Sequence, residues 1–240
     1  MAVPGRYSVT YLIVREDALA IVDVGSISDH ARILSAIDWL GRPKSQVRFV
    51  IPTHLHFDHA MGIDSLATTL GAHVALGEVA LSAVREGRRL PYPKRYLLPK
   101  AVPTWIWQGM PVFAIDDLRR GGDFGFPWSR NRFQATTGPE LQHKCELEGF
   151  PGWTVLSTPG HAADAICLYH AAAGFLIAGD TVRNYYGGEW NSLVCKFADY
   201  ATTRSLLTSL PISTIFPGHG PVIEGDGVIK KVRKVPFYLP

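Results

Sequence analysis

Cysteine is scarce in this chain, with three among 240 residues. Cys145, Cys167 and Cys195 lie far apart and form no CxxC pair, which argues against both a disulfide framework and a thiolate metal site. Each is expected to be a free thiol and to behave as a small buried apolar residue.

Long apolar runs are also missing. No uninterrupted run approaches the roughly 18 residues needed to span a membrane, so no transmembrane segment is expected. The sequence does not open with a positively charged segment followed by an apolar one, so no signal peptide is expected either. Together with the free thiols, these features predict a cytoplasmic protein.

Charge of either sign is modest, at 19% charged residues and a net charge of +3. That balance does not give the basic stripe expected of a nucleic-acid-binding protein. With 47% hydrophobic residues, the chain has enough apolar material for a full globular core. The length suits one domain over residues 1–240, or two small halves that share one core.

Strands and helices are predicted in two parts of the chain, separated by an irregular middle. The first part has the order β-β-α-β-α-β-α, and the second has strands followed by a helix and a last strand, which is typical of helices packed on mixed sheets. Ser28 is expected to cap the first helix. The predicted strands cover 7–14, 18–24, 47–51, 73–76, 153–157, 165–169, 175–178 and 213–216, and the predicted helices 28–40, 61–70, 78–85 and 199–210.

The middle of the chain, residues 87–150, is predicted to be an irregular insertion rich in Pro, Gly, Trp, Arg and Phe. Six basic residues lie between Arg85 and Lys100 against one acid, Glu86, and an aromatic stretch follows at 102–107. This segment is expected to form a lid that binds an anionic or amphipathic substrate. Docking on an anionic membrane surface or on a partner subunit, and a plain solvated loop, are the alternatives.

The strongest chemical signal is the HxHxDH cluster from His54 to His59, directly after a predicted strand and before a helix. Side chains alternate in extended backbone, so His54 and His56 are expected to point the same way. The turn into the helix would then carry Asp58 and His59 towards a second point nearby. One loop could therefore offer ligands to two adjacent metal ions, and a histidine-rich surface loop is the alternative.

Three more candidate ligands, His161, Asp180 and His219, occupy similar places. Each follows a predicted strand and has a glycine beside it, in the motifs TPGH, AGD and FPGHG. Ligands at strand ends are held by the sheet, and the glycine allows a close approach of the backbone. Three such residues in order behind the HxHxDH cluster favour a metal site over separate structural roles.

These motifs in this order, preceded by the VDVG strand end at 22–25, resemble the metallo-β-lactamase superfamily over residues 7–85 and 152–223. The resemblance implies a four-layer αβ/βα sandwich, an α/β fold with the site at one edge of its two sheets. It also implies that Asp23 supports the segment from His54 to His59, called the metal loop below. A metal-bound histidine needs such a partner for its other ring nitrogen. The implied ligands are His54, His56 and His161 for one metal and Asp58, His59 and His219 for the other, with Asp180 bridging both.

Five imidazoles and two carboxylates without cysteine favour two zinc ions, with iron or manganese as alternatives. A hydroxide bridging the ions would attack an ester, lactone, thioester, amide or phosphoester, and Asp58 would orient that nucleophile and return a proton. The expected function is therefore that of a metallo-hydrolase acting on a small-molecule substrate.

Some differences from known members of the superfamily narrow the range of expected substrate classes. Asp180 fills the bridging position as in thioesterases, lactonases and phosphodiesterases, whereas typical β-lactamases have cysteine or serine there. The similar lactonases carry a tyrosine three residues beyond that aspartate, where this chain has Arg183, so Arg183, Tyr185 and Tyr186 are candidate substrate-binding residues. About 20 residues follow His219, which disfavours glyoxalase II with its long C-terminal region.

Other classes remain open from the sequence. A persulfide-dioxygenase-like enzyme would use one iron, and a non-catalytic member of the fold would only bind a ligand. A nuclease is disfavoured because the basic excess is small and confined to one segment. A homodimer formed through the insertion is a further expectation about partners.

Overall fold

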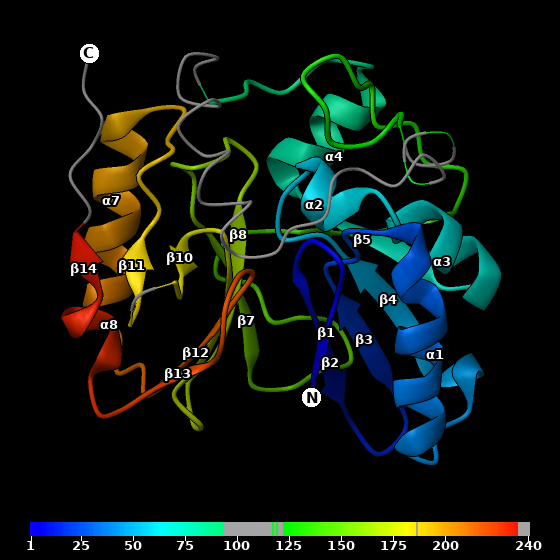
Figure 1. Cartoon of the computed structure of the whole chain (residues 1–240), viewed down its shortest axis with the longest axis horizontal. Coiled ribbons are helices and arrows are strands. Elements are labelled where there is room, and N and C mark those ends of the chain that lie inside the picture. The colour runs from blue at the N-terminus through cyan, green and yellow to red at the C-terminus, as the bar shows by residue number, and fades with distance from the viewer. Residues whose placement is uncertain (94–116, 118, 120–121, 186, 235–240) are drawn as a thin grey trace. The chain divides into compact units, whose positions relative to one another are not determined.

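The computed structural model describes residues 1–93, 117, 119, 122–185 and 187–234. The chain divides into two compact units. The first comprises Met1–Arg89 and Pro111–Leu141, and the second comprises Leu90–Met110 and Gln142–Pro240. In Figure 1 the bulk of the first unit is coloured blue to cyan, and the bulk of the second is green to red.

The first unit is built on a six-stranded sheet in the order β1-β2-β3-β4-β5-β6. The strands from β1 to β3 pair antiparallel, and those from β3 to β6 pair parallel. Helix α3 contacts β4 and β5, α4 contacts β5, and α1 contacts β1 (Figure 1). The elements are β1 (Ala2–Pro4), β2 (Val9–Val14), β3 (Leu19–Val22), η1 (Ile27–Asp29), α1 (His30–Trp39), η2 (Lys44–Gln46), β4 (Val47–Ile51), α2 (Phe57–Ala60), α3 (Ile63–Leu70), β5 (His73–Gly77), α4 (Glu78–Arg85) and β6 (Thr137–Leu141).

Strand β3 is the centre of this unit's core. All four of its residues, Leu19 to Val22, are fully buried, so both faces of this strand are covered, and it lies between β2 and β4 in the sheet. Such strands are apolar along their whole length, as parallel strands buried on both faces require. Asp23, which follows β3, and the loop that follows β4 therefore continue from buried strands.

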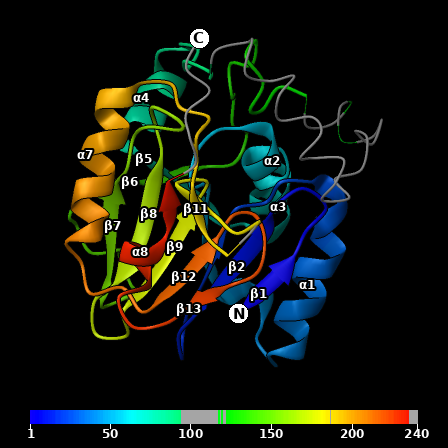
Figure 2. The same ribbon diagram turned by 60° about the vertical axis from the view of Figure 1, so that its left-hand side comes forward.

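The second unit is built on a five-stranded sheet in the order β13-β12-β9-β8-β7, with a small sheet in the order β10-β11-β14. Strands β7, β8 and β9 pair antiparallel, and β9 and β12 pair parallel. Figure 2 shows these strands side by side, and Tyr200 and Leu207 of α7 pack in one core cluster with β8 and β9. The elements are β7 (Trp153–Ser157), β8 (Ile166–His170), β9 (Phe175–Gly179), β10 (Val182–Arg183), β11 (Glu189–Trp190), α7 (Phe197–Thr208), β12 (Thr214–Pro217), β13 (Ile223–Glu224), α8 (Val228–Lys231) and β14 (Arg233–Lys234).

The described residues correct three expectations. Ser28 does not cap α1. Ser26 caps the short η1 turn by accepting a hydrogen bond from Ser28 N, and α1 begins at His30. The strand β6 lies within the region expected to be irregular. Cys145 is exposed and Cys195 half-buried, so only Cys167 is the buried apolar thiol expected of all three.

Among the described helices, none combines the length and the apolar character needed to cross a membrane. The aromatic and basic stretch 94–107, on which the expected lid depends, lies outside the described residues.

Candidate metal centre

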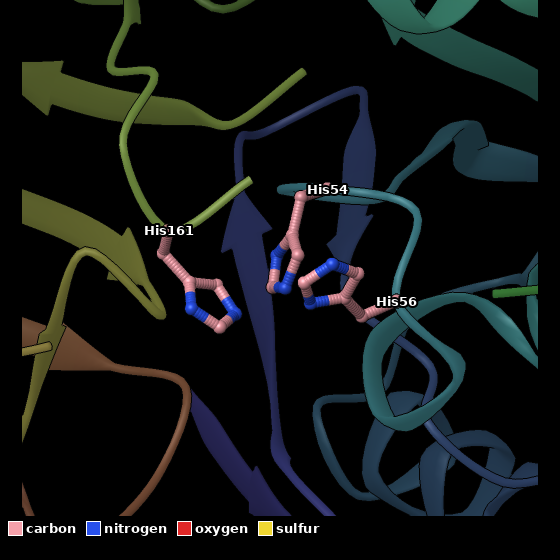
Figure 3. A group of neighbouring side chains, drawn as sticks. All are labelled: His54, His56 and His161. Atoms are coloured by element: carbon pink, nitrogen blue, oxygen red, sulfur yellow. The ribbon is translucent and has the colours of Figure 1, made fainter. Parts of the chain in front are cut away.

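In the first unit, the segment that follows β4 and runs into α2 carries four buried candidate ligands. His54, His56, Asp58 and His59 are 2%, 6%, 8% and 0% exposed. The backbone is still extended at His56 and turns helical at Phe57, where α2 begins, which is the change of direction predicted for this motif. The ring of His54 lies 4.5 Å from that of His56 and 4.3 Å from that of His59 (Figure 3 draws His54 and His56).

Asp23, at the end of β3, holds this loop from behind. Its Oδ1 accepts a hydrogen bond from Thr53 N at 2.6 Å, and its Oδ2 accepts from Thr53 Oγ1 at 2.9 Å. The same Oδ2 lies 2.8 Å from His59 Nδ1, which therefore donates to it. With Nδ1 of His59 committed to the carboxylate, Nε2 is the atom that would bind a metal.

The end of β3 also meets α2 through its backbone. Val24 N donates to the His59 carbonyl at 2.9 Å. A Cβ at Gly25 would lie 2.1 Å from the Asp58 carbonyl oxygen, so only glycine fits there.

Burial, with the nearby Asp23 carboxylate adding to the effect, raises the pKa of Tyr11 on β2 well above its ordinary value, so its hydroxyl stays protonated.

The second unit has three buried candidate ligands of its own, each a short way beyond the end of a strand. His161 lies on the loop after β7 (Figure 3), Asp180 directly follows β9, and His219 follows β12. Oδ1 of Asp180 lies 3.1 Å from His219 Nε2, and Oδ2 lies 3.5 Å from His161 Nε2. One carboxylate therefore stands between two imidazoles.

Asn191 supports this second set and carried no sequence signal, since it belongs to no motif. Its side chain is 1% exposed, and its Oδ1 accepts from Leu193 N at 2.9 Å. The Leu193 carbonyl lies 2.6 Å from His161 Nδ1, which donates to it. Nδ2 of Asn191 then donates to Asp180 Oδ2 at 3.3 Å. One amide thus orients two candidate ligands.

Replacing Asn191 by alanine should weaken the binding of a divalent metal, with zinc as the probe, about tenfold or more, because partners that orient ligands typically contribute that much to metal affinity. The dissociation constant can be measured by competition with a chromogenic chelator. Asn184→Ala is the matched control, since the Asn184 side chain contacts Pro221, Gly187 and Gly188 instead. Equal zinc affinity in the Asn191→Ala and Asn184→Ala proteins would contradict the orienting role.

The structure describes two of the three candidate substrate-binding residues, Arg183 and Tyr185. Arg183 is half-buried in β10, and its guanidinium lies 5.0 Å from the centre of the Tyr185 ring. That ring lies 6.1 Å from the ring of His219, so Tyr185 borders a candidate ligand. Tyr186 lies outside the described residues.

The donor set suits a divalent metal ion. Buried imidazoles and carboxylates in each unit provide nitrogen and oxygen ligands, and Nδ1 of His59 and of His161 is held by a hydrogen bond, as metal-bound histidines require. Cys195 does not add a thiolate ligand to this set of donors, because a cysteine binds metal as a thiolate and this thiol stays protonated. Burial, with a contribution from Asp164, raises the pKa of its thiol to about 12, and its Sγ donates to the His161 carbonyl.

Comparison with known proteins agrees with this chemistry. A "Beta-lactamase-like protein 2 homolog" of Caenorhabditis elegans is 24% identical over 98% of this chain, which spans 63% of that relative's length. A "Probable metallo-hydrolase" of Bacillus subtilis (strain 168) is 26% identical over 93% of this chain and 70% of its own.

Solved structures show the same fold. A metallo-beta-lactamase family protein from Thermus thermophilus matches with a TM-score of 0.63 at 22% identity, over 95% of this chain and 74% of that one. TTHA1623 in a di-iron-bound form matches with a TM-score of 0.57 at 18% identity, over 93% of both chains. The family described as the metallo-beta-lactamase superfamily matches residues 3–219, which is most of the chain. The predicted α/β fold class is therefore confirmed, and the chain belongs to the metallo-β-lactamase superfamily.

Proposed function

We propose that this chain is a hydrolase that uses two divalent metal ions to cleave an ester, lactone, thioester or phosphoester. The observation that carries the proposal is the burial of two sets of histidine and aspartate ligands at the strand ends of a chain from a superfamily of metallo-hydrolases. A relative named as a probable metallo-hydrolase supports the reaction class.

In this proposal His54, His56 and His161 hold one ion, and Asp58, His59 and His219 hold the other. Asp180 serves both, and its two oxygens already face different imidazoles, those of His219 and His161. A carboxylate placed between these two imidazoles could therefore be a ligand of both ions.

Zinc is the proposed metal, because five imidazoles and two carboxylates match its borderline softness. When bound, such ions lower the pKa of water towards neutrality and polarise a carbonyl or phosphoryl oxygen. Iron or manganese is accepted by the same donors, so the metal has to be measured.

The protein's own groups then have distinct tasks. Asp58 is the proposed proton carrier, because one of its oxygens can bind metal while the other accepts and returns a proton. Asp23 fixes the tautomer and direction of the His59 ring, and Asn191 orients Asp180. Arg183 and Tyr185 are proposed to contact the substrate beside His219.

Aspartate at position 180 favours lactones, thioesters and phosphodiesters over β-lactams as substrates. The test is to strip the protein of metal, reload it with zinc, and assay representatives of these three classes. We expect hydrolysis of at least one class that chelation abolishes and zinc restores. Oxygen consumption with a thiol persulfide, restored by iron alone, would instead identify the dioxygenase alternative.

A further inference from the structure

Three aromatic rings of the first unit form a continuous stack that begins within the metal loop. The rings of Phe57 and Phe126 lie 5.1 Å apart and are 6° from parallel. The rings of Phe126 and Trp128 lie 4.9 Å apart and are 4° from parallel. Phe57 is 6% exposed, whereas Trp128, at the other end, is 61% exposed.

The loop that carries Trp128 is held by its own hydrogen bonds. Gly125 N donates to Asn131 Oδ1 at 2.8 Å, and Phe126 N donates to Ser129 Oγ at 3.0 Å. Ser129 N in turn donates to the Phe126 carbonyl at 2.9 Å. Ser129 and Asn131 are 2% and 4% exposed, so buried polar groups fix a loop whose tip presents a large indole to solvent.

This loop is also hydrogen-bonded to the metal loop, the segment that carries four of the candidate ligands. Phe57, which stands between His56 and Asp58 in the sequence, donates its N–H to the Gly125 carbonyl at 3.0 Å. A Cβ at Gly125 would lie 2.1 Å from Phe57 N, and φ there is +77°. Only glycine allows this approach, so the loop and the metal loop are positioned as one piece.

The exposed charged residues described in the loop that carries Trp128 are two bases and one acid. Arg130 and Arg132, which follow Trp128 closely, are both exposed, and Asp123 is the exposed acid of the same loop. An anionic ligand is therefore favoured next to the indole, and a planar ring would extend the stack by one layer.

We propose that Trp128 is a stacking platform for a flat aromatic group on an anionic substrate. An indole that the loop keeps exposed to water gives up the stabilisation that its burial would provide. Because the loop is already ordered, a ligand can use the indole as a contact surface with little further loss of conformational entropy. The identification of that ligand as the substrate rests on the proposed function, whereas the binding itself does not.

The probe is 1-naphthalenesulfonate, titrated into metal-depleted protein and followed by calorimetry. We expect Trp128→Ala to weaken binding about tenfold, since stacking on one aromatic side chain contributes on that order. Trp128→Phe should retain most of the affinity, and neutral 1-naphthalenemethanol should bind more weakly than the sulfonate. Trp39→Ala, which removes a 78% exposed tryptophan from α1, is the matched control and should bind as the native protein does.

The proposal is overturned if Trp128→Ala binds the probe as the native protein does, or no worse than Trp39→Ala. It is also overturned if Trp128→Ala changes only the sedimentation of the protein, which would make this surface an interface between copies. Equal affinity for the neutral and anionic probes would refute the preference for anions. Failure of the hydrolysis assays would refute the proposed function and leave the binding result in place.

Discussion

His56→Ala should release one metal ion per chain and lower hydrolysis by more than about 100-fold, since even the loss of a residue that only orients a ligand costs 10–100-fold. His56 occupies the N-cap position of α2 but makes no capping hydrogen bond with its side chain. Its removal therefore leaves the helix start intact, and the change should act on the metal far more than on the fold.

The measurement is metal content by elemental analysis, together with the rate on whichever of the three proposed substrate classes the metal-loaded protein hydrolyses. His73→Ala is the matched control, because His73 is exposed at the start of β5 and belongs to neither ligand set. It should keep both metal and rate. A His56→Ala protein with full metal and full rate would show that His56 is not a ligand.

Asp23→Asn should weaken metal binding by about 10–100-fold while the protein still folds. Asparagine tolerates the left-handed backbone at this position, where φ is +62°. Its amide oxygen can still accept from Thr53 N, but the NH2 group would then face His59 Nδ1. Nδ1 would have to accept, the proton would move to Nε2, and the ring could no longer bind metal through that atom.

Metal affinity and the free energy of unfolding separate this effect from simple destabilisation. Loss of the charged acceptor should cost about 1–3 kcal/mol of stability. Asp64→Asn is the matched control, because this buried carboxylate accepts from Gln134 N and Ala135 N and contacts no candidate ligand through those bonds. A similar loss of metal affinity in both variants would contradict the orienting role of Asp23.

The parts of the fold that the sequence predicts well have strong local patterns. The predicted bounds of β4, α4 and β7 coincide with the structure, since each is a clear apolar or helical run bounded by breakers. The candidate ligands could be found for the same reason. Each lies on the segment that follows a predicted strand, and a strand end held by the sheet constrains where the next residues lie.

Other features depend on contacts far apart in the sequence. Strand β6 reads Thr-Gly-Pro-Glu-Leu, and of its residues only Leu141 is buried, so no apolar alternation marks it. Its pairing with β5 decides its conformation instead. Ser28 is a residue type that often caps helices, yet it does not cap α1. Ser26 caps the preceding η1 turn instead. Asp117, from a distant segment, accepts hydrogen bonds from Ser26 Oγ and Ile27 N at this turn.

The roles of Asn191 and Trp128 could not be predicted from sequence patterns, because they also depend on contacts between distant segments. The role of Asn191 arises because β9 and the loop beyond β11 bring Asp180, His161 and its amide together. Trp128 sits in the irregular middle, and only the stack on Phe126 and Phe57 relates it to the metal loop. Neither contact leaves a periodic or motif-like trace.

The central claim is that this chain holds two metal ions, and elemental analysis of the purified protein with the Asp58→Ala variant beside it tests that claim most directly. The account predicts about two zinc ions per chain, falling towards one in the variant. About one iron ion per chain, unchanged by Asp58→Ala, would contradict the two-metal hydrolase and support the iron-dependent oxygenase.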